Sequence, residues 1–262
     1  MDYTLNVHGQ LLDLSRPLVM GILNATPDSF YADSRQQTEE DIAVCCSQML
    51  ADGAAIIDVG GCSTRPGGEV ASEAEEMKRL RTALAVVRRQ HPKAVVSVDT
   101  FRPDVARMAV EEFGADIIND VSGGTPEMFR MVTRLRVPYI LMSLQPTMRD
   151  MLLSFAEKVQ QLRDMGASDL ILDPGFGFGK TLEQNYEIMN ELEKLQVMEL
   201  PLLVGISRKS MIYRLFECTP QEALNGTTAL NTIALMKGTD ILRVHDVKEA
   251  VECVKIVQQL NC

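Results

Sequence analysis

The stretch VVSVDTFRPDVARMAVEEFGADIIND, residues 95–120, decides the fold of this chain. Its two ends, residues 95–99 and 117–120, are short apolar runs that each finish on a polar side chain, and this pattern predicts buried strands. The residues between them are typical of a helix, and Gly114 predicts its end because glycine readily adopts the left-handed C-cap conformation. A strand, a helix and a second strand form one βα repeat of a parallel sheet.

The same repeat recurs along the chain. Eight apolar runs that end in a polar or charged residue are separated by helix-like stretches, and they lie at residues 19–24, 55–60, 95–99, 117–120, 139–143, 170–173, 202–207 and 241–246. Eight βα units predict an α/β protein with the (β/α)₈ TIM-barrel fold. Tyr3, Leu5 and Val7 alternate with polar neighbours before Gly9, which predicts an N-terminal β-hairpin at the bottom of the barrel. We expect a single domain, residues 1–262.

Composition excludes several classes of protein. The chain has 262 residues, of which 46% are hydrophobic, and this content is enough for one large core. It contains no apolar run of about eighteen residues and no signal-peptide pattern, so we expect neither membrane insertion nor secretion. Six cysteines without a CxxC pair or zinc-site spacing fit a reducing cytoplasm. A formal net charge of −10 argues against nucleic acid as a partner.

Two late stretches, residues 229–236 and 247–260, carry apolar faces at helical spacing. Packing within one barrel explains these faces, and so does pairing with a second copy of the chain. We favour a homodimer, because the two stretches are neighbouring barrel helices that a second subunit would cover together.

The polar ends of the predicted strands locate the active site. In a TIM barrel, the carboxyl ends of all eight strands line one cleft. We therefore expect convergence of Asn24, Asp99, Asn119, Asp173, Lys209, Arg243 and His245.

Three cationic or imidazole side chains predict an anion site in this cleft. Arg65 lies on a loop that contains hydroxyl, proline and glycine residues, and a guanidinium suits a bidentate contact with phosphate. Arg243 and His245 are two residues apart, so both point to one face of a strand. Together the three residues predict a pyrophosphate site. The alternative is that Arg243 pairs with a structural carboxylate and that His245 is a satisfied core histidine.

Asn24 is the candidate metal ligand. Its side-chain oxygen is a hard donor, and Mg²⁺ that arrives on a pyrophosphate needs few protein ligands. The three histidines and six cysteines show no zinc-ligand spacing, which disfavours transition-metal catalysis.

The carboxylates predict a flat, donor-rich ligand. Asp99 and Asp173 can each accept two adjacent N–H bonds, as from an amino-pyrimidinone edge, although each could instead cap a helix. Residues 173–181 do not fit the Walker A spacing. Their alternating glycines let the backbone approach a flat ligand while Phe178 covers its edge. Lys209 stands at a predicted helix start, where the helix dipole disfavours a cation, and this favours a functional role.

These motifs together resemble the dihydropteroate synthase family from about residue 18 to residue 254. The matching stretches occur in the same order as in the family. They are GILN at 21–24, TPDSF at 26–30, DVGG at 58–61, STRPG at 63–67, SVDT at 97–100, IND at 118–120, DPGFGFGK at 173–180, SRKS at 207–210 and RVHD at 243–246.

The resemblance implies an enzyme of folate biosynthesis that joins p-aminobenzoate to 6-hydroxymethyl-7,8-dihydropterin pyrophosphate and releases pyrophosphate. It implies that the pterin is held by Asp99, Asn119, Asp173 and Lys209. It implies that pyrophosphate and Mg²⁺ are held by Asn24, Arg65, Arg243 and His245. The p-aminobenzoate pocket would then be shaped by Phe30, Thr64, Pro66 and Ser210.

Two stretches depart from the family pattern. Cys62 stands where the family commonly has Glu, and residues 142–146 read MSLQP where the family has MHMQG, with a shorter stretch following. Two alternative functions remain, and these departures motivate only the first of them. One is a pterin-binding paralogue that makes no product, and the other is a pterin-dependent methyltransferase domain, which has no need of a pyrophosphate site.

Overall fold

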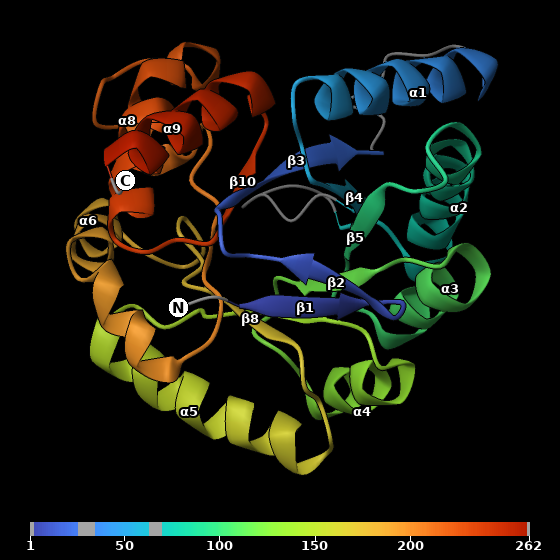
Figure 1. The fold of residues 1–262 in the computed structure, drawn as a ribbon, viewed down its shortest axis with the longest axis horizontal. Helices are drawn as coiled ribbons and strands as arrows, with labels where there is room; N and C mark the ends of the chain where they lie inside the picture. Colours follow the sequence, from blue (N-terminus) through green and yellow to red (C-terminus); the bar gives the residue numbers. More distant parts are fainter. Residues whose placement is uncertain (1–2, 26–34, 63–69, 261–262) are drawn as a thin grey trace.

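The computed structural model describes residues 3–25, 35–62 and 70–260 (Figure 1). An antiparallel hairpin comes first, formed by β1 (Thr4–Val7) and β2 (Gln10–Asp13). The eight strands of the main sheet follow as β3 (Leu18–Asn24), β4 (Ile56–Gly60), β5 (Val95–Asp99), β6 (Ile117–Asp120), β7 (Tyr139–Met142), β8 (Leu170–Asp173), β9 (Leu203–Val204) and β10 (Ile241–Val244).

The main sheet is parallel throughout and closes on itself. Its strand order is β8-β7-β6-β5-β4-β3-β10-β9, so the last long strand lies beside the first. A parallel bridge between Leu172 and Leu202 joins β8 to the residue before β9. The prediction of a (β/α)₈ barrel with an N-terminal hairpin is therefore confirmed.

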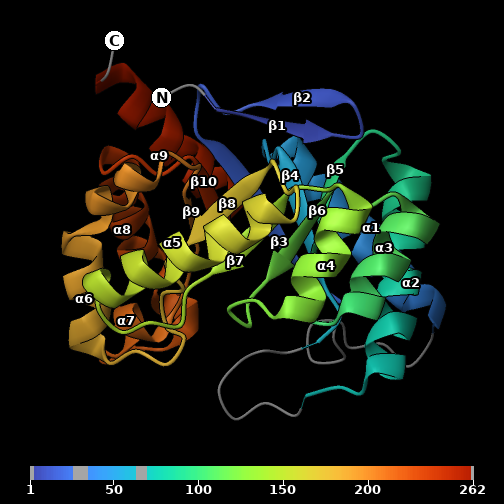
Figure 2. The same ribbon diagram turned by 90° about the horizontal axis from the view of Figure 1, so that it is seen from below.

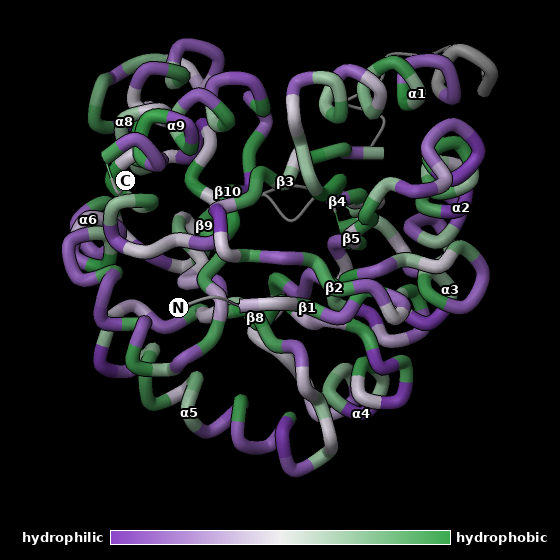
Figure 3. The backbone as a smooth tube through the Cα atoms, in the orientation of Figure 1, coloured by the Kyte–Doolittle hydropathy of each residue, from purple (hydrophilic) through white to green (hydrophobic). Residues whose placement is uncertain are grey.

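Helices surround the barrel (Figure 1). They are α1 (Arg35–Ala51), α2 (Glu73–Gln90), α3 (Pro103–Phe113), α4 (Pro126–Leu135), α5 (Met148–Asp164), α6 (Leu182–Asn190), α7 (Ser210–Tyr213), α8 (Leu224–Met236) and α9 (Val247–Leu260), with 3₁₀ helices η1 (Leu192–Met198) and η2 (Pro220–Glu222). Gly114 ends α3 in the left-handed conformation, as the sequence predicts. Figure 3 shows mainly hydrophobic residues along the barrel strands, whereas hydrophobic and hydrophilic residues alternate along the helices. Among the described residues, no helix is long and apolar enough to cross a membrane.

The last two barrel strands are shorter than the sequence predicts. Residues 202–207 were expected as a strand, but β9 contains only Leu203 and Val204. The chain turns at Arg208, whose φ of 54° is left-handed and cannot continue a strand. Residues 241–246 were also expected as a strand, and β10 ends at Val244. His245 therefore directly follows β10, and Lys209 is the N-cap residue of α7 in the segment after β9, so both follow the carboxyl ends of barrel strands.

The hairpin seals the N-terminal end of the barrel, where Figure 2 shows it lying across the strands. Leu5, Val7 and Leu14 belong to one buried cluster with residues from the barrel interior. Those interior residues are Met20, Ile56, Ile117, Ile140, Ile171, Leu203 and Ile241. Burial of these side chains stabilises the closed barrel and keeps water from its lower half.

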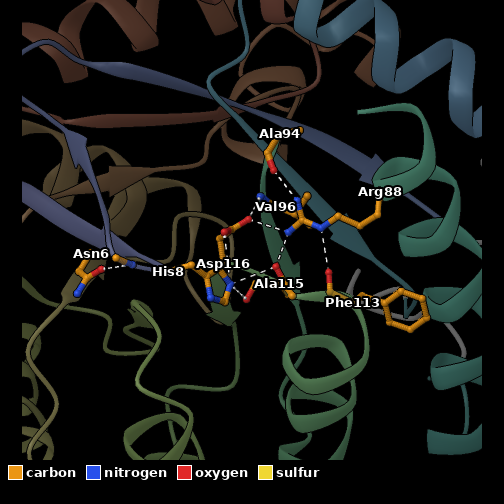
Figure 4. A network of polar contacts seen from close by, with 10 residues as sticks. Asn6, His8, Arg88, Ala94, Val96, Phe113, Ala115 and Asp116 are labelled. Carbon is orange, nitrogen blue, oxygen red and sulfur yellow. Dashed lines mark hydrogen bonds and ion pairs between the residues drawn. The ribbon is translucent and has the colours of Figure 1, made fainter. Parts of the chain in front are cut away.

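A polar network fastens the hairpin and α2 to the bottom of β6 (Figure 4). Asp116 accepts hydrogen bonds from Arg88 Nη2 and from the Val96 backbone N–H, both at 2.8 Å. Arg88 also donates to the carbonyl oxygens of Phe113 and Ala94. His8, in the hairpin turn, places Nε2 3.5 Å from Asp116 Oδ1. One arginine thus holds a helix end, a strand start and a carboxylate together.

We expect Arg88→Met to lower the free energy of unfolding by about 3 kcal/mol, because a nearly buried carboxylate would lose its charge partner. The matched control is Arg81→Met, on the same helix, whose pair with Glu112 is about half exposed on both sides. That control should cost much less, because exposed ion pairs contribute little to stability. Urea unfolding of both variants measures the difference, and equal losses would contradict this account of the network.

Candidate active site

A polar layer lies directly above the apolar floor of the barrel. Each of four strands carries an apolar residue of the sealed cluster and, two positions later, a polar or charged one, so both face the interior. These pairs are Ile56 and Asp58, Ile117 and Asn119, Ile171 and Asp173, and Ile241 and Arg243. The strand pattern therefore changes from apolar to polar at one level of the barrel.

Arg243 connects the carboxylates of this layer. Its Nε donates to Asp58 Oδ2 and its Nη2 donates to Asp99 Oδ2, each at 2.7 Å. Asn119 Nδ2 donates to the same Asp58 oxygen at 3.0 Å. Asp58 has no solvent exposure, and it is a residue that the sequence analysis did not single out. Its position two residues after Ile56, inside an otherwise apolar strand, was the available signal.

Burial and charge shift the ionisation of this cluster. Loss of solvent is the largest effect on Asp99, and it raises the pKa of that carboxyl to about 7 although Arg243 acts in the opposite direction. Burial lowers the pKa of Arg243, but the carboxylates of Asp58 and Asp99 outweigh it and leave that pKa raised. The guanidinium therefore stays charged, and the layer contains a fixed positive charge among acids.

The segment that follows β8, residues 174–180, is called the glycine loop here, and hydrogen bonds with three side chains hold its backbone. Asp173 Oδ1 accepts from Gly175 N at 2.7 Å, and Asn185 Oδ1 accepts from Gly177 N at 2.7 Å. Lys180 Nζ donates to three carbonyl oxygens, including those of Ser143 at 3.0 Å and Gly175 at 2.9 Å. The sequence analysis assigned no role to Lys180, which here ties the loop to the end of β7.

Gly175 is required by this arrangement. Its φ is 68°, and a Cβ at this position would lie 2.2 Å from the Ser143 carbonyl oxygen. Both the backbone conformation and the close approach exclude any other residue. The loop can therefore lie flat against the end of β7.

Lys209 reaches back over the glycine loop. Its Nζ donates to Phe176 O at 2.6 Å and lies 4.6 Å from the centre of the Phe178 ring. Burial lowers its pKa to about 8, partly offset by the charge of Asp173. The turn before it is held by Arg208, which forms a bidentate pair with Asp246 at 2.8 and 2.9 Å. Arg208 thus positions Lys209, a role that local sequence pattern did not predict.

The other predicted residues are placed less completely. Asn24 ends β3 on the strand beside Gly60, and a Cβ added at Gly60 would lie 3.6 Å from Asn24 Oδ1 and 4.0 Å from Asp99 Oδ2. His245 is exposed, and its Nδ1 lies 3.1 Å from Ser207 Oγ. Ser210 begins α7 and is partly exposed. Four predicted residues lie outside the described ranges: Phe30, Thr64, Arg65 and Pro66.

The structure therefore brings together part of the predicted set. Arg243, Asp99 and Asn119 meet through Asp58, and Asp173 meets Lys209 through the glycine loop. Two N–H groups of Arg243 pair with carboxylates, as expected if Arg243 pairs with a structural carboxylate instead of pyrophosphate. Its predicted role toward pyrophosphate stays a prediction.

Comparison with known proteins identifies the family. A family model described as pterin binding enzyme matches residues 20–245. The dihydropteroate synthase of Escherichia coli strain K12 is 41% identical over 266 residues, which cover 95% of this chain and 94% of that protein. The chain belongs to the dihydropteroate synthase family. The Bacillus subtilis dihydropteroate synthase is 38% identical, with 99% of this chain and 95% of that protein covered.

Solved dihydropteroate synthase structures have the same fold along nearly the whole chain. The Xanthomonas albilineans enzyme with 4-aminobenzoic acid gives a TM-score of 0.92 at 34% identity and covers 100% of this chain and 99% of its own. The Yersinia pestis enzyme with a sulfonamide drug gives 0.90 at 38% identity, with 99% of both chains covered. Membership of this family makes the chain a transferase and argues against a pterin-dependent methyltransferase domain.

The buried lysine makes a testable contribution to the pH dependence of stability. Its pKa of about 8 in the folded protein lies below the ordinary value of 10.5. Between these values the unfolded chain binds a proton that the folded protein lacks, so this residue makes stability rise with pH. We therefore expect the free energy of unfolding of the wild type, minus that of Lys209→Met, to increase by about 1–2 kcal/mol between pH 8 and pH 10.

Urea unfolding at several pH values measures this difference. Lys78→Met, at an exposed position of α2, is the control and should give a difference that does not change with pH. A flat difference for Lys209→Met would show that Lys209 keeps its proton throughout this range.

Proposed function

We propose that this chain condenses 6-hydroxymethyl-7,8-dihydropterin pyrophosphate with p-aminobenzoate, forming 7,8-dihydropteroate and pyrophosphate in folate biosynthesis. The observation that carries the proposal is the layer of buried Asp58, Asn119 and Asp173 with the partly buried Arg243, at the mouth of a barrel from this family. Such a layer costs stability in a barrel interior, and recognition of a polar ligand explains its presence.

The pterin would lie on the polar layer. Asp173 uses one oxygen for Gly175 and retains acceptor capacity for the N3–H and 2-amino group of the ring. Asn119 Oδ1 is buried without a protein partner in the structure and offers a further acceptor. Lys209 and Asp99 would complete the contacts to the ring. Phe178, one partly exposed ring above the loop, would cover the edge of the ligand.

The chemical step breaks the bond between the pterin methylene carbon and the pyrophosphate oxygen and forms a bond from that carbon to the p-aminobenzoate nitrogen. Positive charge develops on the pterin methylene and negative charge on the leaving group. Carboxylates near the pterin would stabilise the first, and Arg65, Arg243 and His245 the second. The aniline nitrogen releases its proton once the new bond forms, and it needs no strong base.

Magnesium would accompany the pyrophosphate. Among the described residues, no group of three His, Cys, Asp or Glu side chains could hold a metal ion, so a resident protein cage does not fit. A single oxygen ligand does fit, because Asn24 ends its strand close to Asp99 and offers the hard donor that Mg²⁺ prefers. When bound, Mg²⁺ would neutralise charge on the leaving pyrophosphate.

The p-aminobenzoate pocket would include Ser210, together with Phe30, Thr64 and Pro66 from outside the described residues. Support comes from the X. albilineans enzyme, a relative whose structure contains 4-aminobenzoic acid. Product formation from purified protein, the pterin pyrophosphate, p-aminobenzoate and Mg²⁺ tests the activity. Pterin binding without product would instead indicate the non-catalytic paralogue.

A cytoplasmic homodimer completes the proposal. On α8, Ile233 and Met236 lie three residues apart and are exposed to 41% and 67%. On α9, which packs against α8, Ile256 and Leu260 are exposed one turn apart. Exposed apolar side chains on two adjacent helices suit burial against a second copy of the chain.

We expect Asp173→Asn to weaken pterin binding by roughly thirtyfold or more, because the amide N–H would face a ligand donor in a buried site. Asp120→Asn is the matched control, since Asp120 is equally buried but accepts from the Tyr139 hydroxyl on the other face of β6. Calorimetry gives the affinity and thermal unfolding gives the stability. Unchanged affinity with a lowered melting temperature would mean that Asp173 serves only to hold Gly175.

We expect Met236→Glu to convert a dimer into monomers, because a charge would have to be buried in the interface. Sedimentation velocity measures the mass. Leu153→Glu, at an exposed apolar position of α5, is the control and should leave the assembly unchanged. A wild-type monomer at micromolar concentration would contradict the dimer.

A further inference from the structure

Asp58 occupies an unusual position in the polar layer, because one of its oxygens serves two partners. Asp58 Oδ2 accepts from Arg243 Nε at 2.7 Å and from Asn119 Nδ2 at 3.0 Å. The three residues come from β10, β4 and β6, and β4 lies between the other two in the sheet order. Asp58 is thus the centre of a junction that spans half of the barrel mouth.

The paired carboxylate of Asp58 decides which way the Asn119 amide faces. An ionised carboxylate can accept hydrogen bonds but cannot donate them. The amide of Asn119 must therefore turn its NH₂ group toward Asp58 and its oxygen away from it. The reverse orientation would oppose two acceptors inside a site that excludes water, at a cost comparable to an unmade buried hydrogen bond.

This orientation leaves Asn119 Oδ1 as a buried acceptor without a protein partner. The second oxygen of Asp58, Oδ1, is also buried without a partner. Ser97, on the strand between β4 and β6, has a buried hydroxyl in the same condition. Buried polar atoms are nearly always paired, so the open oxygen of Asn119 in this layer indicates that an N–H group of a ligand pairs with it.

We propose that Asp58 is a positioning residue that sets the selectivity of the site, by fixing Asn119 Oδ1 as an acceptor that requires an N–H from the ligand. The proposal rests on the proposed function and deepens it. The 2-amino group of a pterin has two hydrogens. Asp173 accepts one together with N3–H, and Asn119 Oδ1 accepts the other. In this role Asp58 acts through Asn119 and not through a contact of its own with the amino group.

The consequence is a penalty against rings that lack the amino group. Such a ligand leaves Asn119 Oδ1 unpaired and unable to turn away, because Asp58 holds the amide. When Asp58 is replaced by Asn, the residue at 58 can donate as well as accept. The Asn119 amide is then free to reverse, and the penalty decreases.

The experiment compares two ligands with each variant. The ligands are 6-hydroxymethylpterin and the same 4-oxopteridine without the 2-amino group, and calorimetry at pH 7 gives the ratio of their dissociation constants. The wild type should favour the amino compound strongly. In Asp58→Asn we expect this ratio to fall by about tenfold or more, equivalent to about 1.4 kcal/mol. The buried-carboxylate control Asp120→Asn should keep the wild-type ratio.

A second variant makes the test independent of whether Asp58→Asn folds. Asn119→Ala removes the acceptor and leaves the pair between Asp58 and Arg243, so it should lower the ratio by a similar factor. The double variant should lower it no further than either single one, because both act through the same contact. A merely structural role of Asp58 would weaken both ligands equally and leave the ratio unchanged.

Three results would overturn the inference. They are an unchanged ratio in Asp58→Asn, an unchanged ratio in Asn119→Ala, and additive effects in the double variant. A wild type that does not bind 6-hydroxymethylpterin would be a different failure, since it would refute the proposed function itself and this inference with it.

Discussion

The ion pairs of Arg243 with Asp58 and Asp99 make the rest of the site possible. Several carboxylates within a barrel interior would repel one another and lose hydration, and one largely buried guanidinium that pairs with two of them compensates part of both effects. The pair with Arg243 also affects the protonation of Asp99. Asp99 is held at a raised pKa by burial, while Arg243 keeps it from losing its charge altogether near neutral pH.

The position of this cluster depends on the apolar floor beneath it. Hairpin residues such as Leu5 close the barrel from below, so that polar groups in the next layer can reach solvent or ligand only through the mouth. The apolar end of the barrel therefore contributes mainly to stability, and the polar end contains the candidate active site. Arg88 and Asp116 strengthen the closed end, whereas Asp58 and Asp173 face the open end at a cost in stability.

Local patterns were sufficient to predict the barrel, because most strands are apolar runs of the right length and several helices have periodic apolar residues. They failed at β9, where the left-handed turn at Arg208 depends on Asp246, a partner 38 residues away. The candidate site was predicted as a set of strand ends, but its internal pairing was not. The partner of Arg243 lies 185 residues earlier in the chain, and although the place of Asp58 in an apolar strand marks it as unusual, nothing local indicates that it pairs with Arg243. The role of Lys180 was hidden for a related reason, since its partners are backbone carbonyls that carry no side-chain signature.

The pairing of β10 with β3 also has a consequence for biosynthesis. Leu18 lies opposite Ile241 in the register of these strands, so the barrel closes only when a residue 223 positions after Leu18 has left the ribosome (241 − 18). Until then β3 has an open, apolar edge, which is the kind of surface that associates with other nascent chains. The edge of β3 thus stays unpaired while most of the chain is synthesised. During that time chaperone binding would protect the nascent chain from aggregation.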